Sequence, residues 1–344
     1  MEGPQAIDQE PSKVITSEIS RAEEHVSKAS IDAVVVAGMG PVKLKDLKGS
    51  ERLFPLNPYN RLNAIAAKEL ARKGIVDTVI TSGTTTGKSE KQPLGRIESL
   101  EQVVSEGELL ADTYDRASIG KSLNPEGYAR AEKIIQIDSI AKTTFDNVIQ
   151  AINTLDVRNG VYWQGSIAIL SSEFHGPRIQ EILTAFGIKD ARVLSAERIL
   201  RHFGYNSRLY PKGDFGYGQS YEEFEESIYR AQPAGLENLR DNPSYVTFEL
   251  AKIKSNRRLT EVANSVKAYY LEKGVSLPDV YTLIPTEYDE GFDYDSLRGS
   301  FSQIPFSKHP YRGDEFGEHT GAYRNLAAKV GQETEDFLQS VNVI

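Results

Sequence analysis

The sequence predicts an α/β fold, with a doubly wound, mainly parallel sheet in a Rossmann-like three-layer αβα arrangement and a mostly helical C-terminal extension. Short apolar runs alternate with helical patterns from about residue 31 to residue 194. Several of these runs are apolar on both faces, as in strands that helices cover on both sides. The connections between the runs are long enough for the crossover helices that parallel strands require.

The predicted elements follow one another in a regular order. Two of the helices end at Gly74 and Gly187, residues typical of helix C-termini. The predicted strands are residues 32–37, 76–81, 134–137, 166–171 and 191–194. The predicted helices are residues 17–27, 61–73, 144–155, 177–186, 221–231 and 260–273.

Three parts of the chain differ in pattern. Residues 1–30 form a polar segment with one helix, and residues 31–205 form the α/β core. The core contains an insertion at about 84–132, because that stretch is longer than one crossover needs. Residues 206–344 are rich in Tyr and Phe, which must be buried, so we expect this C-terminal extension to pack on the core.

The composition limits the possible functions. The 344 residues carry a formal net charge of −9 and no local basic patch, so we expect no nucleic-acid partner. The absence of Cys excludes disulfides, thiolate zinc sites, iron–sulfur clusters and a cysteine nucleophile. No run approaches the roughly 18 apolar residues of a membrane span, and the first thirty residues lack the apolar core of a signal peptide. These features predict a cytoplasmic protein, and they leave its oligomeric state open.

Small and polar residues follow four of the predicted strands directly. Because the carboxyl ends of parallel strands meet at one edge of the sheet, these residues predict a site for a small molecule there. They are Gly38 and Gly40, then Ser82 and Gly83, then Asp138, Thr144, Asp146 and Asn147, and finally Ser172, His175 and Arg178.

Three of these residues suggest particular chemistry. His175 lies between a strand and a helix, where it could act as a general acid or base, with Asp146 as the second predicted catalytic residue. Arg178, one turn further on, could clamp a phosphate or carboxylate. The alternatives are a structural His, a surface Arg and, for Asp146 and Asn147, simple capping of a helix whose N-cap is Thr143 or Thr144.

Three carboxylates could also hold a cation. Glu106, Asp138 and Asp146, if they reach the same cleft, would offer hard oxygen ligands for Mg²⁺ beside a phosphate. The alternative is that they are solvated carboxylates on helix faces.

An ordered set of segments resembles the YdcF/SanA/ElyC family over about residues 31–198. The segments are the strand that ends at Gly38, the helix from Arg61 to Gly74, Ser82-Gly83, Ser105-Glu106, the stretch from Asp138 to Asn147, and Ser171-Ser172-Glu173-Phe174-His175 with Arg178. Asp138 and Asp146 stand where that family usually has Glu. The resemblance implies a Rossmann-like domain that binds S-adenosylmethionine or another nucleotide-like ligand, and it adds Arg61 and Glu106 to the candidate ligand-binding residues.

Three other patterns in the sequence are weaker indications of function. Residues 82–89 resemble a phosphate-binding P-loop, but Gly83 and Gly87 enclose three residues where that loop needs four. Ser82 with His175 and Asp146 would form a nucleophilic triad, yet no Gly-x-Ser-x-Gly surrounds Ser82. A stretch with His309 and His319 could cover a pocket or bind metal, although such loops are more often ordered surface.

The sequence therefore predicts a protein that binds a nucleotide-like or phosphorylated small molecule and acts on it as a transferase or hydrolase. The alternative is a non-catalytic ligand sensor whose C-terminal extension transmits binding to a partner.

Overall fold

The fold was determined from a computed structural model. The residues that it describes are 31–38, 42–45, 51–54, 58–83, 105–117, 125–138, 144, 146–148, 151, 165–185, 188, 191–205, 236, 257–274, 276, 287–289 and 316–341. The expected helices at 17–27 and 221–231 lie outside these residues, as do Gly40, His309 and the P-loop-like stretch after Gly83.

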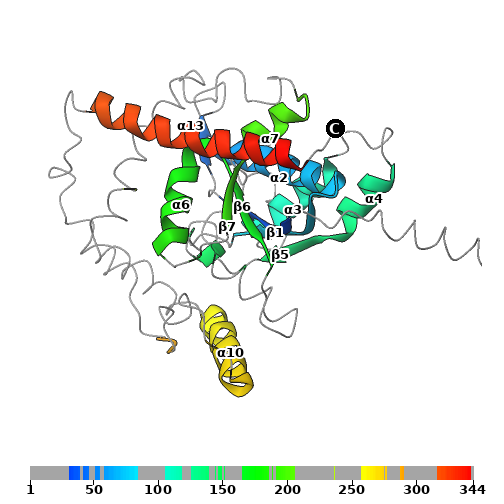
Figure 1. Ribbon diagram of the computed structural model, residues 1–344, viewed down its shortest axis with the longest axis vertical. Coiled ribbons are helices and arrows are strands. Elements are labelled where there is room, and N and C mark those ends of the chain that lie inside the picture. Colours follow the sequence, from blue (N-terminus) through cyan, green and yellow to red (C-terminus); the bar gives the residue numbers. More distant parts are fainter. Residues whose placement is uncertain are drawn as a thin grey trace, which may run out of the picture.

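The centre of the molecule is a five-stranded sheet in which every strand is parallel to its neighbours (Figure 1). The strand order is β5-β4-β1-β6-β7, so the chain starts in the middle, builds one half and then crosses over to build the other. This is the doubly wound order that the sequence predicts. The strands are β1 (Ile31–Ala37), β4 (Val76–Ser82), β5 (Ile135–Asp138), β6 (Ile167–Ser171) and β7 (Ala191–Ser195).

Helices cover both faces of the sheet, which explains why β1 is apolar throughout. Val34 and Val36 are buried in one hydrophobic core, whereas Ala33 and Val35 are buried in the other. The first core contains residues of α2 (Pro58–Arg72), α3 (Glu106–Arg116), α4 (Pro125–Lys133) and α7 (Ala196–His202). The second contains residues of α6 (Gly176–Ala185) and α10 (Arg257–Lys273), together with Val148 and Ala151.

Two features of the structure were not predicted from the sequence. A two-stranded antiparallel hairpin, β2 (Val42–Lys45) with β3 (Glu51–Phe54), lies between β1 and α2 in the chain. The expected insertion contains α3 and α4. Lys68 of α2 donates a 2.7 Å hydrogen bond to the carbonyl of Tyr114, whose hydroxyl donates to the carbonyl of Ala131. These bonds tie α3 and α4 to the layer that α2 forms.

The C-terminal helix α13 (Phe316–Ser340) packs along β7, the last strand of the sheet (Figure 1). Ala327 and Leu338 are buried in the first hydrophobic core, whereas Val330 is buried in the second. The helix therefore joins the two layers around the edge of the sheet, in the position where an uncovered strand invites aggregation. Within the described residues, no helix has the length and apolar character that a bilayer crossing requires.

Candidate functional site

The strand register brings the predicted polar residues into one row at the carboxyl edge of the sheet. Asp138 pairs with Ser82, Ser82 pairs with Ala37, and Ser171 pairs with Ser195. Val36 pairs with Leu170, so the next position places Ser171 beside Ala37. Because paired positions in a parallel sheet point to the same face, these side chains form a polar edge above the second hydrophobic core.

Ser82 is the centre of the first polar group. Its Oγ lies 2.5 Å from Asp138 Oδ2 and 2.9 Å from Asn147 Oδ1, and all three residues are buried. A hydroxyl has one proton, so it donates to only one of these oxygens at a time. The shorter distance is in the range of a hydrogen bond to a carboxylate. Asp138 and Asn147, which lie 56 and 65 residues after Ser82, thus meet at one serine.

Glu106 forms the second polar group, on the other side of the same strand ends. It lies in the first turn of α3, which a capping box between Ser105 and Glu108 holds in place. Its carboxylate accepts a 2.5 Å hydrogen bond from Asn60 Nδ2. Asn60 lies in the first turn of α2 and is fully buried.

Steric contact with Glu106 explains why residues 38 and 83 are glycines. A Cβ on Gly38 would overlap the Glu106 carboxylate and lie 2.9 Å from the carbonyl oxygen of Ser82. Gly83 has φ +150°, and a Cβ there would lie 2.9 Å from Glu106 Oε2. The backbone of β1 and β4 therefore approaches the Glu106 side chain more closely than any other residue type would allow.

His175 and Arg178 lie at the carboxyl end of β6. His175 ends the short 3₁₀ turn η2 (Glu173–His175), which leads directly into α6. His175 is only 7% exposed, and its Nδ1 lies 3.0 Å from Ser171 Oγ. Burial, together with the nearby guanidinium of Arg178, lowers the pKa of His175 to about 3. The imidazole is therefore neutral at pH 7 and a weak base as it stands.

The two ends of the edge are separate groups. Ser82 and Ser171 lie on either side of β1, two strand spacings or roughly 10 Å apart. Ser82 bonds with Asp138 and Asn147, whereas His175 bonds with Ser171. Ser82 and His175 therefore belong to different hydrogen-bonded groups and do not form a triad with Asp146. The boundary between the two groups is the place where a ligand of a doubly wound fold normally binds.

The remaining predicted residues occupy different environments. Asp146 and Ser172 are buried, Thr144 is half-buried at a helical position, and Arg61 is exposed on α2. Among the described residues there is no group of three or more His, Asp and Glu side chains that could hold a metal ion. Glu106, Asp138 and Asp146 thus do not form such a group.

Two polar residues of the site, Asn60 and Ser171, were not among the predicted ligand-binding residues. Asn60 went unnoticed because the predicted helix began one residue later, at Arg61; its position in the first turn of a helix that follows β1 was the available signal. Ser171 was treated as the end of a strand. Only the 3₁₀ turn, which brings the imidazole of His175 back to the Ser171 hydroxyl, reveals its role.

A groove of about 780 Å³ lies elsewhere, between α6, β7 and α13. Its lining includes Gln180, Arg192, Lys329 and Phe337. None of the predicted site residues that the structure describes lines it, so we treat it as distinct from the carboxyl-edge site.

The fold and the site together define a doubly wound α/β protein with a buried polar edge at the carboxyl ends of its strands. Comparisons with family models, with curated protein sequences and with solved structures gave no match. The assignment of function therefore depends on the geometry of this edge.

Proposed function

We propose that the protein binds a nucleotide-like or phosphorylated small molecule at the carboxyl edge of the sheet and acts on it as a transferase or hydrolase. The observation that carries the proposal is the meeting of Ser82 at the end of β4 with Asp138 and Asn147, at and beyond the end of β5, in one buried hydrogen-bonded group. Fold stability alone does not require such a group, because an apolar cluster would stabilise these strand ends at a lower desolvation cost.

The strand order supports the position of the ligand. In a doubly wound sheet the crevice opens where the order reverses, which here is between β1 and β6. Gly38 follows β1 at that point, and α6 begins just beyond β6. A ligand there would meet acceptor groups on the β4 side and Arg178 on the β6 side. Hydroxyl groups suit the former and a phosphate or carboxylate the latter.

The low pKa of His175 fits a role that begins when the ligand binds. The cationic Arg178 is one of the two causes of the low pKa. An anionic group placed beside Arg178 would offset that charge, raise the pKa of His175 and make the imidazole a stronger base. The proposed catalytic role of His175 therefore depends on an anionic ligand.

The resemblance to the YdcF/SanA/ElyC family suggests the first ligand to test, S-adenosylmethionine. Its ribose hydroxyls match the acceptors Glu106 and Asp138, and its carboxylate matches Arg178. Adenine nucleotides present the same two kinds of group and are the second set to test.

A ligand sensor is the second candidate function. It is favoured by the burial of His175 and its neutral imidazole, because a catalytic base normally has a pKa near the working pH. Turnover distinguishes the two: binding without any chemical change in the ligand would favour the sensor.

The test compares two carboxylate replacements on the same helix. Glu106→Gln removes the charge that lies against Gly38 and Gly83, whereas Asp112→Asn removes an exposed charge that pairs with the exposed Arg116. Calorimetry with S-adenosylmethionine, AMP and ATP should give binding to the wild type and to Asp112→Asn, and a loss of about tenfold or more in Glu106→Gln. Equal binding by both variants, or no binding by the wild type together with no small molecule retained on purification, would contradict the proposal.

A further inference from the structure

Helix α13 contacts the turn that carries His175 at the residue before His175 and at the residue after it. The Tyr323 hydroxyl donates a 2.7 Å hydrogen bond to the carbonyl of Phe174. On the other side, a Cβ on Gly176 would lie only 2.8 Å from Val330 Cγ1, so α13 lies directly against the backbone there. Phe174 and Gly176 are the two neighbours of His175 in sequence. The position of His175 is thus tied to a helix that begins 141 residues later, at Phe316 (316 − 175).

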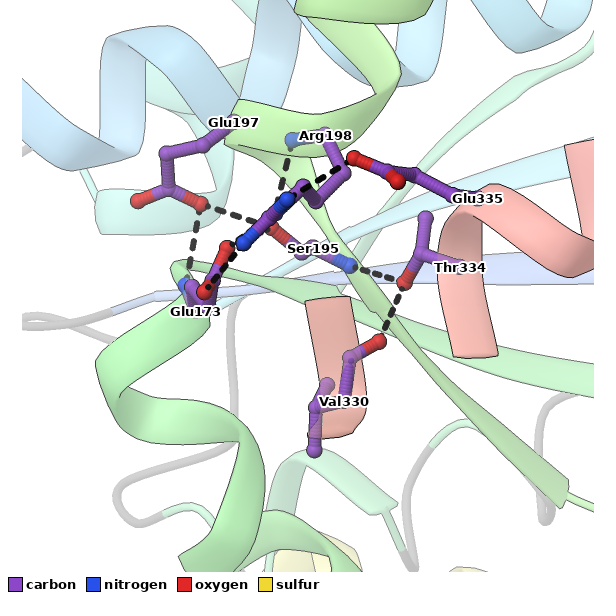
Figure 2. Close-up of polar contacts among 7 residues, drawn as sticks. All are labelled: Glu173, Ser195, Glu197, Arg198, Val330, Thr334 and Glu335. Carbon is purple, nitrogen blue, oxygen red and sulfur yellow. Dashed lines mark hydrogen bonds and ion pairs between the residues drawn. The ribbon is translucent and has the colours of Figure 1, made fainter. Parts of the chain in front are cut away.

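An ion-pair bridge adds a third connection (Figure 2). Arg198 of α7 lies between two carboxylates. Its Nε and Nη2 donate to Glu173 of η2 at 2.7 and 3.0 Å, and its Nη1 donates to Glu335 of α13 at 2.8 Å. The side chains of the three residues remain 16–28% exposed. The bridge is therefore geometrically specific, but water can reach it and replace it.

The backbone of β7 supplies a fourth connection. The amide of Ser195 donates a 3.0 Å hydrogen bond to Thr334 Oγ1, which in turn donates to the carbonyl of Val330 (Figure 2). Thr334 thus pairs an amide at the end of an edge strand that would otherwise need water or another strand.

Gly331 explains why α13 can approach so closely. A Cβ at this position would lie 2.7 Å from Arg198 Nε and 2.8 Å from Glu173 Oε2. Any other residue at position 331 would therefore displace Arg198 and Glu173 from each other or from α13. Gly is unfavourable in a helix by about 1 kcal/mol relative to Ala, so its presence here is consistent with a packing requirement.

We propose that α13 is a strap that closes over the turn Glu173–His175 and controls access to the His175 end of the site. Its contacts to that turn are the carbonyl hydrogen bond from Tyr323, the partly exposed ion pair through Arg198 and the contact of Val330 with Gly176. Ala327 and Leu338 keep α13 anchored in the first core, so the opening that we propose is a local separation of the turn from the seated helix. With the strap seated, His175 is buried and bonded to Ser171. When the turn separates from α13, it loses these partners and the imidazole becomes accessible. That α13 regulates activity rests on the proposed function, whereas its control of access to His175 rests only on these contacts.

The test uses two glycines of the same helix. Gly331→Ala inserts a methyl group into the ion pair, while Gly321→Ala adds the same group where nothing lies within 4 Å. Both changes raise the intrinsic helix propensity, so neither weakens α13 as an isolated helix. Neutral imidazoles react with diethyl pyrocarbonate, and mass spectrometry of the full chain gives the rate at each His. The exposed His202 serves as the internal reference.

In Gly331→Ala the rate at His175 relative to His202 should rise about tenfold or more, with lost hydrogen-exchange protection in residues 172–178. Gly321→Ala should match the wild type. A second pair covers the case in which Gly331→Ala does not fold: Arg198→Met removes the bridge, and Arg201→Met removes an exposed cation from the same helix.

The proposal would be wrong if the reactivity of His175 were unchanged in Gly331→Ala. If that variant is unfolded, unchanged reactivity in Arg198→Met would show the same. The proposal would also be wrong if the reactivity of His175 rose equally in the control variants Gly321→Ala or Arg201→Met. No ligand enters the experiment, so the absence of a ligand for the site would overturn the proposed function and leave this result standing.

Discussion

Single residues at the carboxyl edge have environments that the sequence could not show. The position of His175 between a strand and a helix predicts a base. In the structure its imidazole is buried beside Arg178, and burial and this cation together lower its pKa to about 3. Arg61 and Arg178 both lie near the start of a helix, yet Arg61 is exposed and Arg178 is half-buried close to His175. Burial, which depends on tertiary packing, separates residues that look equivalent in the sequence.

Replacement of Arg178 should affect the ligand and His175 together. Arg178→Ala removes the cation that we propose for a phosphate, so AMP binding should weaken by about 1.5–3 kcal/mol while adenosine binding stays nearly unchanged. The same change removes one cause of the low pKa of His175, so that pKa should rise. Calorimetry with the two ligands and an NMR titration of the imidazole measure the two effects.

The control for this prediction is Arg61→Ala. Its side chain is exposed, so the variant should bind AMP as the wild type does. Equal losses for AMP and adenosine in Arg178→Ala would mean that the change acts through the fold, and a loss in Arg61→Ala would show that this exposed arginine reaches the ligand after all.

Among the elements, α7 contains a carboxyl group with unusual acid–base behaviour. Glu197 accepts hydrogen bonds from the Glu173 amide at 2.9 Å and from Ser195 Oγ at 3.1 Å (Figure 2). Burial is the main cause that raises the pKa of Glu197, to about 7, and the neighbouring Glu173 carboxylate adds to it. Arg198 and Glu335 are the other charged groups of this cluster.

The raised pKa of Glu197 predicts a fall in stability between about pH 4.5 and pH 7. In this window the folded protein holds a proton on Glu197 that the unfolded chain, with its ordinary value of 4.5, has released. Stability is therefore highest below this window and is lost as the pH rises through about 7, by about 3 kcal/mol at most. Residue 197 cannot ionise in Glu197→Gln. The free energy of unfolding of this variant, relative to that of the wild type, should therefore increase as the pH rises from 4.5 to 7.

His175 acts in the opposite direction, which decides how the measurement is made. Its pKa is lowered, so the stability it contributes is present above its ordinary value of 6.5 and is lost as the pH falls toward 3. The two groups oppose each other between pH 4.5 and 6.5, and the wild-type profile alone would hide both. Urea unfolding of Glu197→Gln, the wild type and the exposed-site control Glu333→Gln at several pH values isolates the Glu197 effect. A difference between Glu197→Gln and the wild type that does not change with pH would contradict it.

For the whole molecule, the elements predicted best were those with a strong local signal. The sheet strands are buried apolar runs, and α2 and α6 carry a clear helical period, so their positions were confirmed to within a few residues. The hairpin of β2 and β3 was missed because its strands are only four residues long, and the helices α3 and α4 were missed because their polar segments gain their structure from packing on α2.

The site shows the same division between local and long-range information. The strand ends placed Ser82, Asp138 and Asn147 on one edge in the sequence analysis, since the rule for parallel strands needs no side-chain detail. The bond between Ser82 and Asp138 depends on register, and that between Asn60 and Glu106 depends on how α3 packs on α2. The role of α13 is the most distant relation, and its sequence contains no local sign of the residues that it contacts.

The whole fold should depend on the C-terminal extension. Removal of residues 206–344 would take away α13, which buries Ala327, Phe337 and Leu338 against the first core and pairs the Ser195 amide at the end of β7. An uncovered edge strand beside an exposed apolar surface favours association between chains. We therefore expect a chain that ends at Tyr205 to aggregate and to bind an apolar dye, as measured by light scattering and fluorescence. A chain that ends at Val341 retains α13 and should behave as the full protein does. If the shorter chain were instead monomeric and unfolded cooperatively, the α/β core would be stable by itself, and α13 would contribute to access and regulation without being needed for folding.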